Sequence, residues 1–157
     1  MAHRFVVIGG GPAGNEAATT AARLGAEVTL IERDVVGGAA HLWDCIPSKA
    51  MIATGGAIAG MRRAEGMGLR EPTVDLDFDA MRTRISTIQG RLESSVTGLL
   101  ESQGVRLLQG TGRLLDAHHV EFIHPEGGTE TIEADTVVLS TGSRPRIPDW
   151  APKTRFV

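Results

Sequence analysis

The chain has 157 residues, which is enough for one domain with a proper hydrophobic core. Its net charge of −3 provides no basic surface for nucleic acid or for an anionic membrane, and an aromatic content of 4% argues against a base-stacking surface. A single cysteine excludes an intrachain disulfide framework and predicts a cytoplasmic protein. The apolar run near the N-terminus is too short for a signal peptide or a membrane span.

The first elements form a βαβ unit. Residues 4–8 are a short, β-rich apolar run, which predicts a buried parallel strand. The alanine-rich residues 15–24 predict a helix that stops at Gly25, and residues 27–32 predict a second strand. A strand, a helix and a strand within about thirty residues are typical of a Rossmann-like α/β fold.

A glycine-rich loop joins the first strand to the first helix. Gly9, Gly11 and Gly14 complete the pattern GxGxxG, in which the first permits a tight turn, the second lets backbone approach a pyrophosphate and the third lets the helix pack closely. Glu32 ends the second strand, where such sites need an acid for the ribose hydroxyls. The sequence therefore predicts a dinucleotide site without a 2′-phosphate, although a glycine-rich turn in an unrelated α/β protein remains the alternative.

Two further helices are expected. Residues 48–63 read as a helix that three glycines weaken, and residues 79–102 predict a long helix. The apolar residues of the long helix recur at spacings of three and four and share one face. They are Met81, Ile85, Ile88, Leu92, Val96 and Leu99.

The second half of the chain is rich in short strands. Residues 105–109 and 136–140 predict buried strands. Three short alternating runs between them predict an antiparallel meander, with a turn at residues 125–128. These runs are residues 113–116, 120–123 and 129–132.

Residues 37–49 (GGAAHLWDCIPSK) read like half of a redox centre. Cys45 is the only cysteine of the chain, so this segment has no second thiol for an intrachain redox disulfide. No His or Cys cluster has the spacing of a metal site. His41, His118 and His119 are interpreted as structural residues.

The glycine loop, the cysteine segment and a later Thr-Gly segment together resemble the flavoproteins with two dinucleotide-binding domains, the family of glutathione reductase and dihydrolipoamide dehydrogenase. Their redox motif is usually Gly-Gly-Thr-Cys, four residues, and then Cys-Ile-Pro-Ser-Lys. Gly37, Gly38 and residues 45–49 match it, whereas Ala40 stands in place of the first cysteine and Asp44 in place of a glycine. Residues 110–113 and 140–145 resemble two further family segments, so the resemblance covers about residues 4–148.

The resemblance implies a Rossmann-like FAD-binding domain over residues 1–150, with a parallel sheet, helices on both of its faces and a three-stranded antiparallel meander. Residues 151–157 would begin a linker to an NAD(P)-binding domain. The chain would then be the N-terminal part of a longer, homodimeric protein, with a free-standing FAD module as the alternative.

The resemblance also implies the site residues. Cys45 would lie under the isoalloxazine ring, either tuning the flavin or buried and inert, and Lys49 would stabilise negative charge on the reduced ring; these two are the candidate catalytic residues. The implied FAD-binding residues are Gly9, Gly11, Pro12, Ala13, Gly14, Glu32, Arg33, Gly38, Ala39, Asp44, Cys45, Lys49, Gly112, Arg113, Thr141 and Gly142.

Three functions stay open. The pattern without the first cysteine most resembles a branch of actinobacterial, lipoamide-dehydrogenase-like NAD(P)H quinone reductases. This resemblance implies electron transfer from NAD(P)H through FAD to a quinone-like acceptor. The second reading is a disulfide reductase of the dihydrolipoamide dehydrogenase type that pairs Cys45 with a thiol from elsewhere. The third is a non-catalytic module that binds FAD or ADP.

Overall fold

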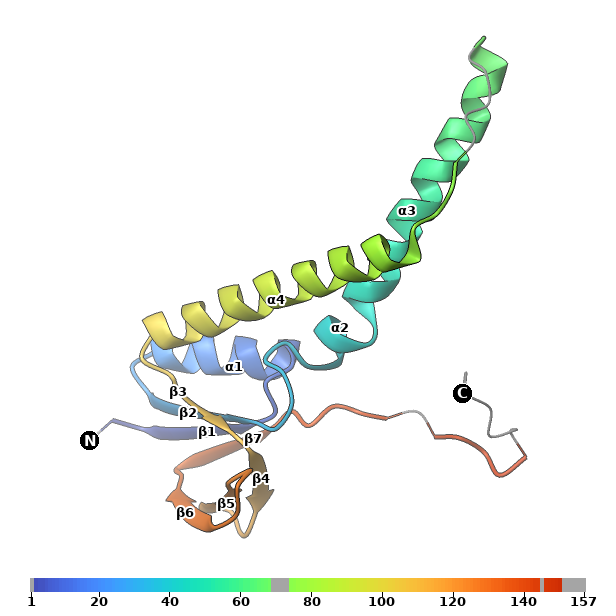
Figure 1. Ribbon diagram of the computed structural model, residues 1–157. Helices are drawn as coiled ribbons and strands as arrows, with labels where there is room; N and C mark the ends of the chain where they lie inside the picture. Colours follow the sequence, from blue (N-terminus) through green and yellow to red (C-terminus); the bar gives the residue numbers. More distant parts are fainter. Residues whose placement is uncertain (1, 69–73, 145, 151–157) are drawn as a thin grey trace.

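The computed structural model describes residues 2–68, 74–144 and 146–150. Its centre is a parallel sheet in the order β3-β2-β1-β7, formed by β1 (Arg4–Ile8), β2 (Glu27–Glu32), β3 (Arg106–Gln109) and β7 (Thr136–Leu139) (Figure 1). β1 and β2 have the bounds that the sequence predicts, because each is a short segment rich in β-branched and other apolar residues. The predicted linker at residues 151–157 lies outside the described residues.

Two helices, α1 (Pro12–Arg23) and α4 (Phe78–Ser102), pack over one face of this sheet (Figure 1). α1 begins earlier than predicted, because Pro12 occupies its first turn, where a missing N–H costs nothing. The core on this side joins alternate strand residues to both helices. It includes Val7, Ala18, Leu30 and Leu100.

The meander covers the opposite face of the sheet. It consists of β4 (Thr111–Leu114), β5 (His119–Ile123) and β6 (Thr129–Glu133), paired antiparallel in that order. Val120 and Phe122 of β5 pack against the side chains that point away from the helices. These strand residues are Val6, Ile8 and Ile31.

The predicted fold class is therefore confirmed, with one difference in arrangement. The sequence led us to expect helices on both faces, whereas the helices packed on the described sheet share one face and the meander occupies the other. The meander is itself amphipathic, because the burial of β5 alternates along the strand. It can therefore shield the second apolar face as a helix would.

A helical arm extends from the sheet. α2 (Gly38–Leu42) is a short helix that the sequence analysis missed, and α3 (Cys45–Arg63) follows it, beginning three residues earlier than predicted. A 3₁₀ turn, Ala64–Met67, ends the arm. Figure 1 shows α3 running outward beside the beginning of α4. Ala50 is the one buried residue of α3 among the described side chains, so this arm packs loosely within the described chain.

The apolar face of α4 follows the predicted stripe until its last turn. Met81, Ile85, Ile88, Leu92 and Val96 are half-buried, as expected. Burial departs from the stripe at its last member: Leu99 is 50% exposed, whereas Leu100 is fully buried. Both residues are helical neighbours of Val96, and Leu100 is the one that joins the core cluster beneath α4 with Leu30 and Val105.

This difference gives a direct stability test. Leu100→Ala is expected to lower the free energy of unfolding by about 2–5 kcal/mol, because it opens a cavity beneath α4. Leu99→Ala is the matched control and should cost under about 1 kcal/mol, since half of that side chain is already in water. Urea denaturation followed by circular dichroism measures both. Equal losses would contradict this placement of the core.

Candidate dinucleotide-binding site

The glycine loop lies where β1 ends and α1 begins, at the carboxyl edge of the parallel sheet. Gly9 has a φ of +107°, which disfavours any other residue, and a Cβ there would overlap the carbonyl of Ser140. A Cβ on Gly14 would overlap the carbonyl oxygen of Gly9 and lie 2.5 Å from Oγ of Ser140. The first and third glycines are therefore required by close backbone packing, in the roles that the sequence predicts.

Gly11, in contrast, faces open space. A Cβ on Gly11 would meet no heavy atom within 4 Å. Gly11 is the N-cap of α1 and Pro12 follows it, so no side chain caps the helix, and its first turn holds no acidic residue. The first backbone N–H groups and the positive end of the helix dipole are thus left for an anion. The loop fits a pyrophosphate on these grounds.

Glu32 carries the buried carboxylate of the site and is 8% exposed. Its Oε2 accepts a hydrogen bond from the N–H of Gly10 at 2.6 Å, and its Oε1 accepts one from the N–H of Asp34 at 2.7 Å. A carboxylate oxygen can accept more than one hydrogen bond, so the group retains capacity for a ribose hydroxyl. Glu32 therefore also fixes the loop itself, a role that sequence reasoning missed.

The turn after Glu32 is held from the neighbouring strand. Nε2 of Gln109, the last residue of β3, donates to the carbonyl oxygens of Arg33 and Asp34, each at 2.9 Å. The guanidinium of Arg33 lies 3.4 Å from the carboxylate of Asp34 and is half exposed. Sequence reasoning missed Gln109, because nothing in a strand-end glutamine signals two bonds to a distant turn.

Three other segments meet the loop. The N–H of Gly37 donates to the carbonyl of Gly10 at 2.7 Å, and a Cβ on Gly38 would lie 3.0 Å from Cα of Gly11. Oγ of Ser140 donates to the carbonyl of Gly9 at 2.6 Å. A Cβ on Gly112 would lie 3.0 Å from Ile8. Segments distant in sequence thus converge at one edge of the sheet.

Exposed candidates lie in the segments around this edge. Pro12 and Ala13 are exposed in the first turn of α1. Ala39 is exposed on α2, and Thr141 and Gly142 are exposed beyond the end of β7. Their exposure leaves them accessible to a ligand, but no contact in the described structure assigns them a role.

No hydrogen bond within the described part of the chain joins the remaining candidates to the loop. Cys45 is exposed at the first position of α3, and Asp44 and Lys49 are exposed beside it. Nε of Arg113 donates to a carboxylate oxygen of Glu121 at 2.8 Å, so its charge is paired within the meander. The assignments of these residues to FAD therefore stay predictions.

Two polar atoms near the loop lack partners among the described residues. Oδ1 of Asn15, in the first turns of α1, and Nδ1 of His41, in α2, are buried without a hydrogen bond. Buried polar atoms are normally paired. The surroundings of the loop thus retain unmet hydrogen-bonding capacity, which suits a site completed by a polar ligand.

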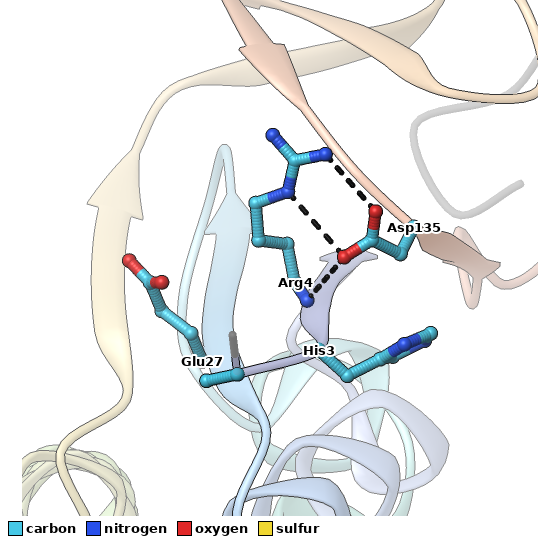
Figure 2. A pocket seen from close by; sticks show the side chains of 5 residues that line it. His3, Arg4, Glu27 and Asp135 are labelled. Atoms are coloured by element: carbon cyan, nitrogen blue, oxygen red, sulfur yellow. Dashed lines mark hydrogen bonds and ion pairs between the residues drawn. The ribbon is translucent and has the colours of Figure 1, made fainter.

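A separate pocket opens at the amino ends of the strands, away from the glycine loop (Figure 2). Its volume is about 590 Å³, and Arg4, Glu27 and Asp135 line it. Arg4 and Asp135 form a double contact, which lowers the pKa of Asp135 to about 2 and raises the pKa of Arg4; Glu133 also binds Arg4. Since ligands of parallel sheets bind at the carboxyl ends of the strands, this pocket is not the nucleotide site.

Within the ranges that the structure describes, no three His, Cys, Asp or Glu side chains gather closely enough to hold a metal ion. None of the described helices is both long and apolar enough to cross a membrane.

Known proteins resemble this chain closely. The NAD(P)H dehydrogenase (quinone) of Mycobacterium tuberculosis is 38% identical over 163 residues, which cover 94% of this chain and 32% of that protein. The dihydrolipoyl dehydrogenase of Chlamydia pneumoniae is 38% identical over 141 residues, covering 90% and 30%. The crystal structure of LpdA from Mycobacterium tuberculosis superimposes with a TM-score of 0.84 at 36% identity, covering 93% of this chain and 33% of that one.

The chain thus spans about a third of the length of these relatives. The family model for pyridine nucleotide-disulphide oxidoreductases matches residues 3–154, which is nearly the whole sequence. Together with the glycine loop and the parallel sheet, this match shows that the chain belongs to the pyridine nucleotide-disulphide oxidoreductase family.

Proposed function

We propose that this chain is the FAD-binding part of an oxidoreductase that passes electrons from NAD(P)H to a quinone or a similar small acceptor. The observation that supports it most is the cradle formed by Gly11, the uncapped start of α1 and the buried carboxylate of Glu32. This combination offers N–H donors to phosphates and an acceptor to a ribose. The M. tuberculosis relative named NAD(P)H dehydrogenase (quinone) supports the choice of acceptor.

Each part of the cradle would hold one part of FAD. The start of α1 would bind the pyrophosphate, and Glu32 would bind the adenosine ribose. Lys49, an exposed cation on α3, would stabilise negative charge on the flavin, and Cys45 would lie beneath the ring. FAD, when bound, would supply the acceptor for a hydride from NAD(P)H, a chemical role that the protein's own side chains cannot fill.

The cysteine content supports a small acceptor over a disulfide. Thiol–disulfide exchange needs a second thiol to resolve the mixed disulfide, and this sequence contains only Cys45. Ala40 occupies the position where the family carries its substrate-attacking cysteine. Electrons would therefore leave the flavin for a quinone-like molecule without a protein dithiol.

The nicotinamide site would lie outside residues 1–150. The relatives are about three times as long as this chain, so the proposal includes a separate NAD(P)-binding domain. We also propose that the whole protein is a cytoplasmic homodimer. Size-exclusion chromatography with light scattering on the longer protein tests the dimer.

The visible absorption spectrum of the purified chain, with added FAD and then anaerobic NADPH, tests the proposal. A flavin band that stays with the protein supports FAD binding, and bleaching by NADPH would place a nicotinamide site in the same sample. A retained band without bleaching is the result expected for residues 1–157 alone. Failure to retain FAD would contradict the assignment of this chain as the FAD-binding part.

An activity assay tests the choice of acceptor. In a longer protein that carries both nucleotide sites, reduction of lipoamide in place of quinones would favour a disulfide reductase.

Cys45→Ser separates a tuning thiol from an essential one. Because residues 1–157 hold no second cysteine to pair with Cys45, the substitution is expected to leave quinone reduction within about threefold in a protein that carries both nucleotide sites. Steady-state reduction of a quinone by NADPH measures the change. Ser48→Ala, in the same turn of α3, is the matched control. Near-total loss of quinone reduction in Cys45→Ser, with normal activity in Ser48→Ala, would overturn the tuning role.

A further inference from the structure

Side chains of α4 form hydrogen bonds to the backbone just before and just after the segment around Cys45. We define this redox segment as residues 43–49. On the side before it, Nε2 of Gln89 donates to the carbonyl oxygens of His41 at 2.8 Å and of Leu42 at 3.2 Å. On the side after it, Nη1 of Arg84 donates to the carbonyl oxygen of Ala50 at 3.5 Å. Two side chains of one helix thus bracket the segment that carries the candidate catalytic residues.

The local structure makes these bonds important. α2 has five residues, so its last carbonyl oxygens lack partners within the helix, and the amide of Gln89 supplies both donors. The start of α3 has no side-chain cap, because the N-cap residue Asp44 makes no such bond. The first turn of α3 is held within the segment by Ser48, whose Oγ and N–H both donate to the carbonyl oxygen of Asp44, and α4 adds the bonds on either side of it.

α4 also contacts the helix that starts at the glycine loop. Its far end is anchored in the core through Val96 and Leu100, and it packs against α1, whose first residues follow Gly11. Leu100 is fully buried, so this end of α4 cannot shift without opening the core. α4 is therefore a rigid connection between the cradle and the redox segment.

We propose that Gln89, supported by Arg84, is a positioning residue that sets where Cys45 and Lys49 stand relative to the nucleotide cradle. The inference rests on the proposed function, since the cradle would hold the adenosine end of FAD and the redox segment would meet its flavin end. Gln89 itself belongs to neither the cradle nor the redox segment. It acts through the carbonyls of α2, which lead directly into the redox segment.

Hydrogen exchange in the free chain tests the clamp without any ligand. The N–H groups of Trp43 and Asp44 both donate to the carbonyl of Ala39 at 2.9 Å, so they report on the join between α2 and α3. Gln89→Met keeps the length of the side chain and removes both donors, and we expect about tenfold faster exchange confined to residues 39–50. Gln89→Lys, which restores a donor, should return exchange toward the original rate. Unchanged exchange, or faster exchange throughout the chain, would overturn the clamp.

Binding measurements test the consequence for the cofactor. In Gln89→Met, ADP affinity is expected to stay within about twofold, whereas FAD affinity should fall about tenfold, because only FAD would reach the redox segment. Arg84→Met should act in the same direction, and Arg82→Met, whose guanidinium binds Asp79 on its own helix, is the matched control. Equal losses of ADP and FAD would overturn the positioning role. An unaltered chain that binds neither ligand would contradict the proposed function, and hydrogen exchange would then decide the clamp alone.

Discussion

Gly14→Ala is expected to abolish ADP and FAD binding and to lower the free energy of unfolding by about 2 kcal/mol or more. The added methyl group would overlap the carbonyl oxygen of Gly9 and press on Oγ of Ser140. Both obstacles belong to the packed join between β1, α1 and β7, so α1 must move away from the loop. Isothermal titration with ADP and urea denaturation measure the two losses.

Gly98→Ala is the control for this substitution. Gly98 lies in α4, and a Cβ there would meet no heavy atom within 4 Å. Alanine is the better helix former, so this variant should raise the free energy of unfolding by about 0.5–1 kcal/mol and leave ADP affinity unchanged. ADP affinity retained within a few fold in Gly14→Ala would show that the loop tolerates a side chain, and the close packing described here would be wrong.

Glu32→Leu is expected to weaken ADP binding by more than about tenfold and to destabilise the fold by about 1–3 kcal/mol for each N–H that loses its acceptor. The carboxylate accepts hydrogen bonds from the N–H groups of Gly10 and Asp34. Leucine fills the space without offering an acceptor, so these groups lose their partner in a buried place. Calorimetry and denaturation give the two values.

Two further variants sharpen this result. Glu27→Leu changes an exposed glutamate at the other end of the same strand and should shift stability by no more than about 0.5 kcal/mol. Glu32→Gln keeps one acceptor oxygen, so its ADP affinity and its free energy of unfolding should lie between those of the unaltered chain and those of Glu32→Leu. If Glu27→Leu and Glu32→Leu behaved alike, the effect would come from lost charge, and the proposed role of the buried carboxylate would be contradicted.

The parts of the fold that sequence reasoning predicted correctly depend on local patterns. β1 and β2 are short segments rich in β-branched and other apolar residues, and polar or glycine residues mark their ends, so their bounds follow directly. The stripe of α4 was correct up to Val96, because helical periodicity is also local. The spacing did not show that Leu100 and not Leu99 is buried in the last turn, since the packing of that turn in the core decides between them. The short helix α2 has too few residues for any periodicity to appear.

The sequence predicts the chemistry of the site, but it did not reveal the hydrogen bonds that hold the site's segments in place. The glycine pattern and Glu32 signal a dinucleotide because their spacing is set by the loop and strand themselves. The bonds from Gln109 to the turn after Glu32, and from Gln89 to the end of α2, join residues far apart in sequence. Such contacts depend on how the layers pack, and a glutamine in a strand or helix gives no sign of them. The placement of Cys45 and Lys49 beside a flavin stays a prediction for the same reason.

The sheet order has a consequence for folding during synthesis. β1 is made first, yet one of its two neighbours is β7, which follows all the other strands of the described sheet in the chain. Ser140, directly after β7, donates to the carbonyl of Gly9, across 131 positions of the chain. A growing chain on the ribosome can therefore form the βαβ unit early but cannot close the nucleotide loop until β7 has emerged. Until then β1 presents an unpaired, apolar edge, so the interval before β7 emerges is when the nascent chain is most exposed to aggregation.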